Sequence, residues 1–386
     1  MGLRDLLRDH RVVVCVGSGG VGKTTTAAAL AVHAAMEGKK VLCLTIDPAR
    51  RLANSLGLRE MVTEEQDIPA SLFAEHGLSL AGSLSAMMLD TKRTFDDLVA
   101  RNASSPEVRD RILGNRLYQY VSTSLAGTQG YMAMEKLHDV RQRGDWDLIV
   151  LDTPPTSNAL DFLDAPERLV GLVDSPAVRW FIQAFQGTGK ISLNLVGKGA
   201  AFLLRGLAKF TGAEFLDYVA EFVVDLNDLF GGFRERARAV ESALRSPEVA
   251  FVIVTSPSPL AVDEAVFFHR KLEESQMQAD AFVVNGIHEL LPEPSAKRPE
   301  LEAAAAEALP EGIDPKRAVE RMRRALDDER LRGVADRVEA ERLRTLLRGE
   351  TPLVEVPALE RDVHDLAALA EVARFLTDET DGQEAA

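Results

Sequence analysis

The chain has 386 residues, 46% of them hydrophobic, and its 45 basic and 60 acidic side chains give a net charge of −15. That composition excludes wholesale disorder, and the acidic excess argues against a nucleic-acid partner, because such binding depends on Lys and Arg that neutralise phosphates. The first residues are charged and lack an apolar signal core, and no stretch approaches the ~18 apolar residues of a membrane helix. We therefore predict a cytoplasmic protein.

The few cysteines and histidines bear on metals and disulfides. Cys15 and Cys43 lie inside apolar runs, which predicts two buried thiols in strands. Neither has the closely spaced partner that a zinc site needs, and no two histidines lie four residues apart. We expect neither a disulfide scaffold nor a structural zinc.

Six runs of Val, Ile, Leu and Phe predict short strands buried on both faces, at residues 11–16, 40–46, 147–152, 250–255, 281–285 and 353–356. Helical patterns separate most of them, and the first helix is expected over residues 23–37. Strands that alternate with helices indicate an α/β fold with a doubly wound, mostly parallel sheet.

Three long blocks lie between these strands, and all are expected to be helical rather than extended. Residues 79–143 have helical spacing, and residues 167–245 are unusually apolar and rich in aromatic side chains. Residues 288–348 open with a proline-rich segment and continue as a charged helix with apolar Val319, Met322 and Leu326. That helix either packs one stripe against the protein or is fully solvated.

The most specific motif is a glycine-rich loop directly between a predicted strand and a predicted helix. Residues 17–24 satisfy G-x-x-x-x-G-K-[ST], whose backbone N–H groups at a helix N-terminus surround phosphates. Lys23 is expected to reach the β- and γ-phosphates of ATP, and the Thr24 hydroxyl to bind Mg²⁺. The predicted nucleotide-binding residues of this loop are Gly19, Gly20, Val21, Gly22, Lys23, Thr24 and Thr25.

Two aspartates follow other predicted strands and so belong at the same sheet edge, where ligands of open α/β sheets bind. Asp152 has the Walker B position and is expected in the Mg²⁺ shell. Asp47 is expected near the metal as well, where it would orient or deprotonate the attacking water. The turn at residues 153–156 is a candidate sensor of the γ-phosphate.

At this point the sequence resembles a known family, the arsenical-pump and tail-anchored-protein-targeting ATPases of the deviant-Walker-A class. The resemblance spans most of the chain and rests on five motifs in order: GSGGVGKTT, TIDPARRLANSLG, LDTPPTSNALDFLDAPERL, FVVNGI and VPALERDV. It implies a parallel sheet with an inserted helical subdomain, and a dimer that closes around ATP. It also implies that Asp47 serves hydrolysis, that Asn285 contacts adenine, and that Pro357 and Ala358 lie beside the base.

We divide the chain by combining these readings. The nucleotide-binding α/β core comprises residues 1–60, 145–166, 247–287 and 350–376. A helical subdomain comprises residues 61–144 and 167–246, a charged helical insertion residues 288–349, and a flexible tail residues 377–386. The aromatic residues of the subdomain form either a groove for a hydrophobic client helix or membrane partner, with residues 186–199 as its lid, or simply a core and dimer seam.

One departure from the family concerns the dimer. The family's loop begins G-K-G-G-V-G-K, and its first lysine reaches the partner's phosphates, whereas this chain has Ser18 there. A cation donated across an interface is worth roughly 10³–10⁵ in rate, by analogy with arginine fingers. Either a paralogue that carries the lysine completes a heterodimer, or the chain is a slow homodimer.

A second departure is the shortage of cysteine. Arsenite binding needs thiolates, and two strand-buried cysteines do not supply them, so an arsenite- or anion-pump motor is the weaker alternative. A DNA-segregation or division-site ATPase fits poorly, because the chain ends in an acidic segment. A nucleotide-binding subunit with little turnover remains open because of Ser18. The leading prediction is a dimeric switch ATPase that acts on a protein or membrane partner.

Overall fold

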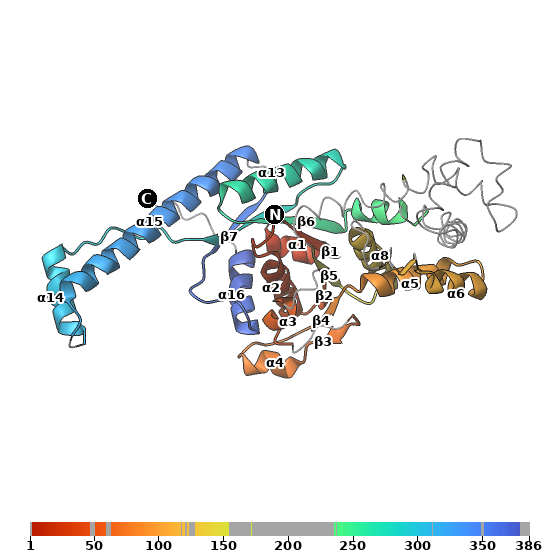
Figure 1. Ribbon diagram of the computed structural model, residues 1–386, viewed down its shortest axis with the longest axis horizontal. Coiled ribbons are helices and arrows are strands. Elements are labelled where there is room, and N and C mark those ends of the chain that lie inside the picture. The colour runs from red at the N-terminus through yellow and green to blue at the C-terminus, as the bar shows by residue number, and fades with distance from the viewer. Residues whose placement is uncertain are drawn as a thin grey trace, which may run out of the picture.

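A computed structural model describes residues 2–46, 51–58, 63–116, 118–119, 122, 128–153, 171, 235–236, 238–310, 312–348 and 351–378. These residues form one eight-stranded sheet with helices on both faces (Figure 1). The strands are β1 (Val12–Val16), β2 (Lys40–Thr45), β3 (Gln66–Asp67), β4 (Ser83–Met88), β5 (Leu148–Asp152), β6 (Val249–Thr255), β7 (Ala281–Ile287) and β8 (Leu353–Pro357).

The strand order is β3-β4-β2-β5-β1-β6-β7-β8, and every described pairing is parallel except that of β3 with β4. The predicted α/β class with a mostly parallel sheet is thus confirmed, and each of the six predicted strands exists with ends that differ by at most two residues. β1 lies between β5 and β6, so the loop after β1 starts near the middle of the sheet. The strand order reverses around it, which makes this edge the expected ligand crevice.

Helices flank the strands and are ended by recognisable caps. The helices are α1 (Leu3–Asp9), α2 (Lys23–Met36), α3 (Arg51–Ser55), α4 (Ala70–Glu75), α5 (Thr91–Asn102), α6 (Pro106–Gly114), α8 (Thr128–Arg143), α13 (Pro259–Glu274), α14 (Arg298–Ala308), α15 (Pro315–Leu346) and α16 (Leu366–Thr377). Asp365, for example, accepts a hydrogen bond from Ala368 N at 2.7 Å and so caps α16. No helix within the described ranges is long and apolar enough to cross a membrane.

Alternate residues of each central strand enter two separate cores. Val12 and Val14 pack with α5, α8, α13 and the end of α15 on one face. Val13 and Cys15 pack with α1, α2 and α16 on the other face. Because both faces of the sheet are covered, the sequences of its central strands are continuous apolar runs without polar alternation.

One expectation was wrong, because residues 79–143 contain a sheet strand. β4 lies within this block and pairs in parallel with β2 over six residues. Its sequence, SLSAMM, has none of the β-branched or aromatic residues that mark strands, so only its pairing with β2 reveals it. The domain boundaries themselves stay a prediction.

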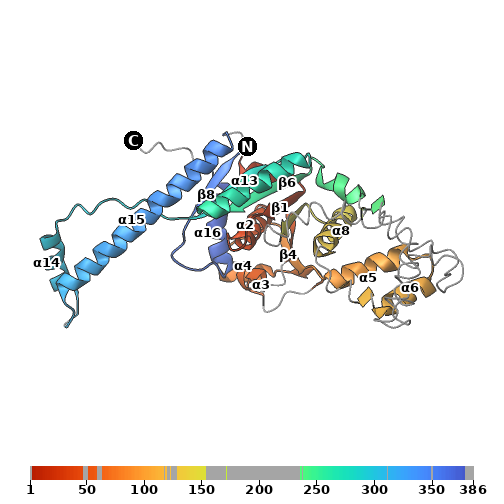
Figure 2. The same cartoon turned by 45° about the horizontal axis from the view of Figure 1, so that its top comes forward.

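The charged insertion contains α14 and the 32-residue α15, which stand out from the β8 side of the sheet (Figure 1 and Figure 2). α15 packs one stripe, as predicted, with Val319 buried and Leu326 half-buried. Met322, expected in that stripe, is 67% exposed. The stripe is thus covered at Val319 and partly at Leu326, and the neighbouring helix α14 has no buried residue of its own.

Most of the apolar block at residues 167–245 falls outside the described residues, and so does its proposed lid at residues 186–199. Residues 238–244 of the block are helical. The choice between a client groove and a core therefore stays a prediction, and so does the flexible tail, most of which is also outside the described residues.

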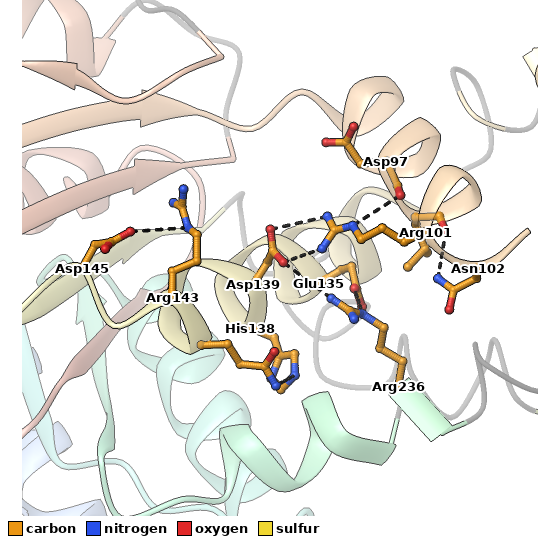
Figure 3. A network of polar contacts seen from close by, with 11 residues as sticks. Asp97, Arg101, Asn102, Glu135, His138, Asp139, Arg143, Asp145 and Arg236 are labelled. Carbon is orange, nitrogen blue, oxygen red and sulfur yellow. Dashed lines mark hydrogen bonds and ion pairs between the residues drawn. The ribbon is translucent and has the colours of Figure 1, made fainter.

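A polar network joins Arg236 of this block to α8 and α5 (Figure 3). Arg236 forms an ion pair with the fully buried Glu135, and Arg101 forms another with Asp139 at 2.5 Å. Burial raises the pKa of Glu135, while the charge of Arg236 opposes that shift. The carboxylate of Glu135 therefore depends on Arg236 to remain ionised in a dry environment.

We predict that Arg236→Leu lowers the free energy of unfolding by about 3–5 kcal/mol, because it leaves a buried carboxylate without its partner. The loss should deepen as pH rises above 4.5, the ordinary pKa of a glutamate. In that range the unfolded chain releases the proton of Glu135, whereas the folded variant, in which the pKa of Glu135 is raised further, retains it. Urea unfolding between pH 4.5 and 8 measures both effects.

The control is Arg324→Leu, which removes an exposed pair with Glu320 and should cost less than about 1 kcal/mol at every pH. Equal losses in the two variants would show that burial of Glu135 carries no cost.

Candidate functional site

The glycine-rich loop joins the end of β1 to the start of α2. Gly22 directly precedes α2 and has φ +95°, a left-handed conformation that favours glycine. A Cβ at this position would lie 2.2 Å from Nδ2 of Asn285, so the absence of a side chain also makes room for β7. Gly20 has φ +81° as well, but a Cβ there would meet nothing within 4 Å. At Gly17, the first residue of the loop, a Cβ would lie 1.9 Å from the carbonyl oxygen of Val254. The loop is thus shaped by backbone conformation and by two close approaches.

Lys23 is buried, and its Nζ donates a hydrogen bond to the backbone carbonyl of Ser18 at 2.6 Å. The ammonium group therefore lies inside the loop. It adds a positive charge to the backbone N–H groups that would surround a bound phosphate. Ser18 is 9% exposed, and its Oγ has no hydrogen-bond partner among the described residues. Within this chain, residue 18 is a buried loop residue.

Three oxygen-bearing side chains meet at the ends of β2, β5 and the start of α2. Thr24 Oγ1 donates to Asp152 Oδ2 at 2.8 Å, and Thr45 Oγ1 donates to the same oxygen at 3.0 Å. The parallel register brings this about, because Asp152 is paired with Thr45 on one side and with Cys15 on the other. Asp152 is fully buried. A hydroxyl and a carboxylate at this distance suit a hard cation such as Mg²⁺.

The predicted base-binding residues lie at the ends of β7 and β8. Asn285 Nδ2 donates to the carbonyl of Val21 at 2.9 Å, so its side chain lies against the phosphate loop. Pro357 is the last residue of β8, and Ala358 N donates to the carbonyl of Ile287 at 2.8 Å. The pairing of β7 with β8 is irregular between Asn285 and Ile287.

The other predicted site residues either make no contact that bears on their role or lie outside the described residues. Gly19 is exposed, and Thr25 is half-buried in the first turn of α2. Asp47 lies outside the described residues, as do residues 154–156 of the proposed sensor turn. The role of Asp47 therefore stays a prediction.

Two threonines belong to this constellation: Thr45, which was not predicted, and Thr153, the first residue of the predicted sensor turn. Thr45 binds Asp152, and Thr153 Oγ1 donates to the carbonyl of Cys15 at 2.8 Å, which ties the residue after β5 to β1. Both are polar residues at the carboxyl ends of apolar strands, next to the predicted aspartates. That position was the available signal.

The site fits a magnesium–nucleotide complex by its own chemistry. The loop offers a buried ammonium group and glycines that leave its backbone accessible, and Thr24 with Asp152 offers oxygen ligands. Among the described residues, no group of three or more His, Cys, Asp or Glu side chains is placed to hold a metal ion. Thr24 and Asp152 would hold Mg²⁺ together with nucleotide phosphates, as is usual for this ion.

Cys15 and Cys43 are free and buried on β1 and β2, as predicted. Burial raises the pKa of both thiols, and the nearby Asp152 raises them further. Both groups are therefore neutral thiols at physiological pH.

A parallel sheet with a glycine-rich loop between its central strand and α2, and a carboxylate on the neighbouring strand facing the loop's threonine, defines a P-loop NTPase fold. The family resemblance predicted from the motifs is also confirmed. The sequence pattern of the anion-transporting ATPase family matches residues 10–309, and this chain belongs to that family.

Two curated relatives are similar to part of the chain. The ATPase get3 of Aspergillus terreus (strain NIH 2624 / FGSC A1156) is 31% identical over 156 residues, which is 40% of this chain and 42% of the relative. The ATPase GET3 of Phaeosphaeria nodorum (strain SN15 / ATCC MYA-4574 / FGSC 10173) is 30% identical over 154 residues, 39% of this chain and 43% of the relative. The matched region thus spans about two fifths of these relatives.

We predict that Gly22→Ala destabilises the nucleotide-free protein by more than Gly20→Ala does. Both substitutions place alanine at positive φ, which costs about 1–2 kcal/mol. Only Gly22→Ala also pushes a methyl group into Asn285, so Asn285 must give up its bond to Val21. Thermal and urea unfolding without nucleotide measure the difference.

The double variant Gly22→Ala/Asn285→Ala should recover the part of the loss that comes from the close approach. If the second substitution adds its own loss with no recovery, the contact between Gly22 and Asn285 does not constrain the loop.

Proposed function

We propose that this chain binds ATP with Mg²⁺ and hydrolyses the bond between its β- and γ-phosphates. The observation that carries the proposal is the 2.8 Å hydrogen bond between Thr24 and Asp152, which unites the loop hydroxyl and the Walker B carboxylate beside the buried Lys23. Membership of the anion-transporting ATPase family supports it, and both similar relatives bear the name ATPase.

Each residue has a distinct task in this proposal. Lys23 would leave the carbonyl of Ser18 and hold the β- and γ-phosphates, aided by the backbone N–H groups of residues 19–25. Thr24 and Asp152 would hold Mg²⁺, which supplies charge neutralisation when bound. Asp47 would orient the attacking water or accept its proton. Asn285, with Pro357 and Ala358, would border the base.

Turnover is proposed to depend on a dimer that closes around the nucleotide. Ser18 offers no positive charge, so a homodimer would lack a trans-acting cation at the position of the family's first lysine and would use another cation or none. Two arrangements follow: a heterodimer in which a lysine-bearing paralogue supplies that cation, or a homodimer with slow turnover. A low-turnover nucleotide-binding subunit is the second candidate function, and the same buried serine favours it.

The nucleotide state is proposed to control the apolar helical subdomain and, through it, a hydrophobic protein client or membrane partner. This part of the proposal rests on the family resemblance and on the aromatic content of residues 167–246. An arsenite-pump motor has no support from the two buried neutral thiols.

We predict that Lys23→Ala lowers ATP hydrolysis by at least about 100-fold, because it removes the charge that stabilises the γ-phosphate in the transition state. Phosphate release by purified protein with Mg²⁺ measures this, and chelation of Mg²⁺ should abolish the wild-type signal. Met322→Ala on the exposed surface of α15 is the matched control and should keep wild-type activity.

Asp47→Asn should lose hydrolysis while it retains bound nucleotide, since it alters water activation rather than phosphate binding. Because this variant should keep ATP bound, it can also be used to pull down a client protein in the nucleotide-bound state. Activity that is insensitive to both Lys23→Ala and Mg²⁺ removal would refute the proposed ATPase.

The substitution Ser18→Lys tests the missing cation. If the isolated chain lacks a trans-acting charge, the variant should hydrolyse ATP at least about tenfold faster than wild type, a small share of the 10³–10⁵ ascribed to such groups. Single-turnover hydrolysis at several protein concentrations measures it, because a trans effect grows with dimerisation. Equal rates would show that the lysine is dispensable here.

A further inference from the structure

Helix α15 has two apolar faces, and the protein covers only one of them. The covered stripe includes Val319, Ala340 and Leu343. On another side of the same helix, Leu331, Val334 and Val338 are 69%, 50% and 60% exposed. Isolated exposed apolar residues are ordinary, but a row of three on one helix in an acidic protein is a candidate contact surface.

The three residues form a continuous row. Their spacing of three and four residues places them one above the other along the helix, the spacing of the seam in a two-stranded coiled coil. Figure 1 and Figure 2 show that α15 projects from the sheet, so much of its length is reachable by another molecule. We call Leu331, Val334 and Val338 the α15 seam.

The seam continues onto the neighbouring helix α13. Arg342, one turn beyond Val338, forms an ion pair with Asp263 of α13. Leu260 and Phe267 lie three and four residues from Asp263 on the same side of α13, and both are exposed. The apolar surface therefore extends across both helices around one ion pair.

The charges at the two ends of the seam indicate what covers it. Asp327 lies one turn before Leu331, and Arg342, which within its own chain already pairs with Asp263 and Glu339, lies one turn after Val338. If a second copy of α15 lay alongside in parallel, Asp327 would meet Asp327 and Arg342 would meet Arg342, and both meetings are repulsive. If it lay antiparallel about a point between Val334 and Ala335, Leu331 would face Val338, and Asp327 would face Arg342.

We propose that the α15 seam pairs two copies of this chain in an antiparallel, two-fold symmetric contact. Such a contact is self-complementary, with apolar residues at its centre and an acid–base pair at each end. It requires neither nucleotide nor the phosphate loop, so it is separate from the proposed dimer that closes around ATP. Failure of one therefore leaves the other untouched.

Cysteine cross-linking tests the geometry directly. Val334 lies next to the symmetry point, so Val334→Cys should form a disulfide between copies in nucleotide-free protein. Met322→Cys is the matched control, because Met322 is 67% exposed but lies about 180° around the helix from Leu331. The two native cysteines are buried and give little background.

We expect mild oxidation to cross-link Val334→Cys at least about tenfold faster than Met322→Cys. Equal rates would overturn the proposal, because collisions in solution would then explain both.

Sedimentation equilibrium without nucleotide tests the affinity. Wild type should reach twice its chain mass of 42.1 kDa at micromolar concentrations. Val334→Asp should weaken this association by at least about 100-fold, since each copy would bury a charge in the seam. Because Val334 is half exposed, the variant should fold normally, as circular dichroism can check.

Met322→Asp should associate like wild type. A wild type that stays monomeric up to about 100 μM, or a dimer that Val334→Asp leaves intact, would overturn the proposal.

Discussion

The hydrogen bond between Thr24 and Asp152 expresses the constraint on which the site depends, namely the parallel register of β1, β2 and β5. Asp152 is level with Cys15 on one side and Thr45 on the other, so its carboxylate meets hydroxyls from a helix and a strand. Thr153 fastens the next residue back to β1. A one-residue slip of β5 would turn Asp152 to the other face of the sheet. The phosphate loop and its carboxylate are thus fixed by sheet pairing.

The loop is also held from the far side by β7. Asn285 donates to Val21 at the point where Gly22 lacks a side chain, so the residue proposed to border the base already touches the phosphate loop. Two segments distant in the sequence, the end of β5 and the end of β7, therefore meet at this loop. The buried Ser18 lies in the same loop, and its carbonyl accepts the hydrogen bond from Lys23.

Helix α15 illustrates how a single charged helix serves two surfaces. Its buried side carries Asp336, which accepts hydrogen bonds from the backbone N–H and Nδ1 of His288 at 2.9 and 2.7 Å and so anchors the helix to the end of β7. Its seam faces outward with a row of apolar residues between opposite charges. The contact between Asp336 and His288 connects α15 to β7, the strand that carries Asn285. An assembly through α15 would consequently lie close to the end of β7.

The sequence by itself determined the phosphate loop, the six apolar strands and the family, because consecutive glycines before Lys23 and unbroken Val/Ile/Leu runs have few other structural meanings. It did not reveal β4, whose Ser, Ala and Met residues become a strand only through pairing with β2. It also missed Thr45, since nothing local shows that this hydroxyl meets Asp152 from 107 positions away. It placed Met322 in the packed stripe of α15, but the structure leaves that residue exposed. Local patterns record which residues avoid water, whereas only the tertiary structure decides which surfaces cover them.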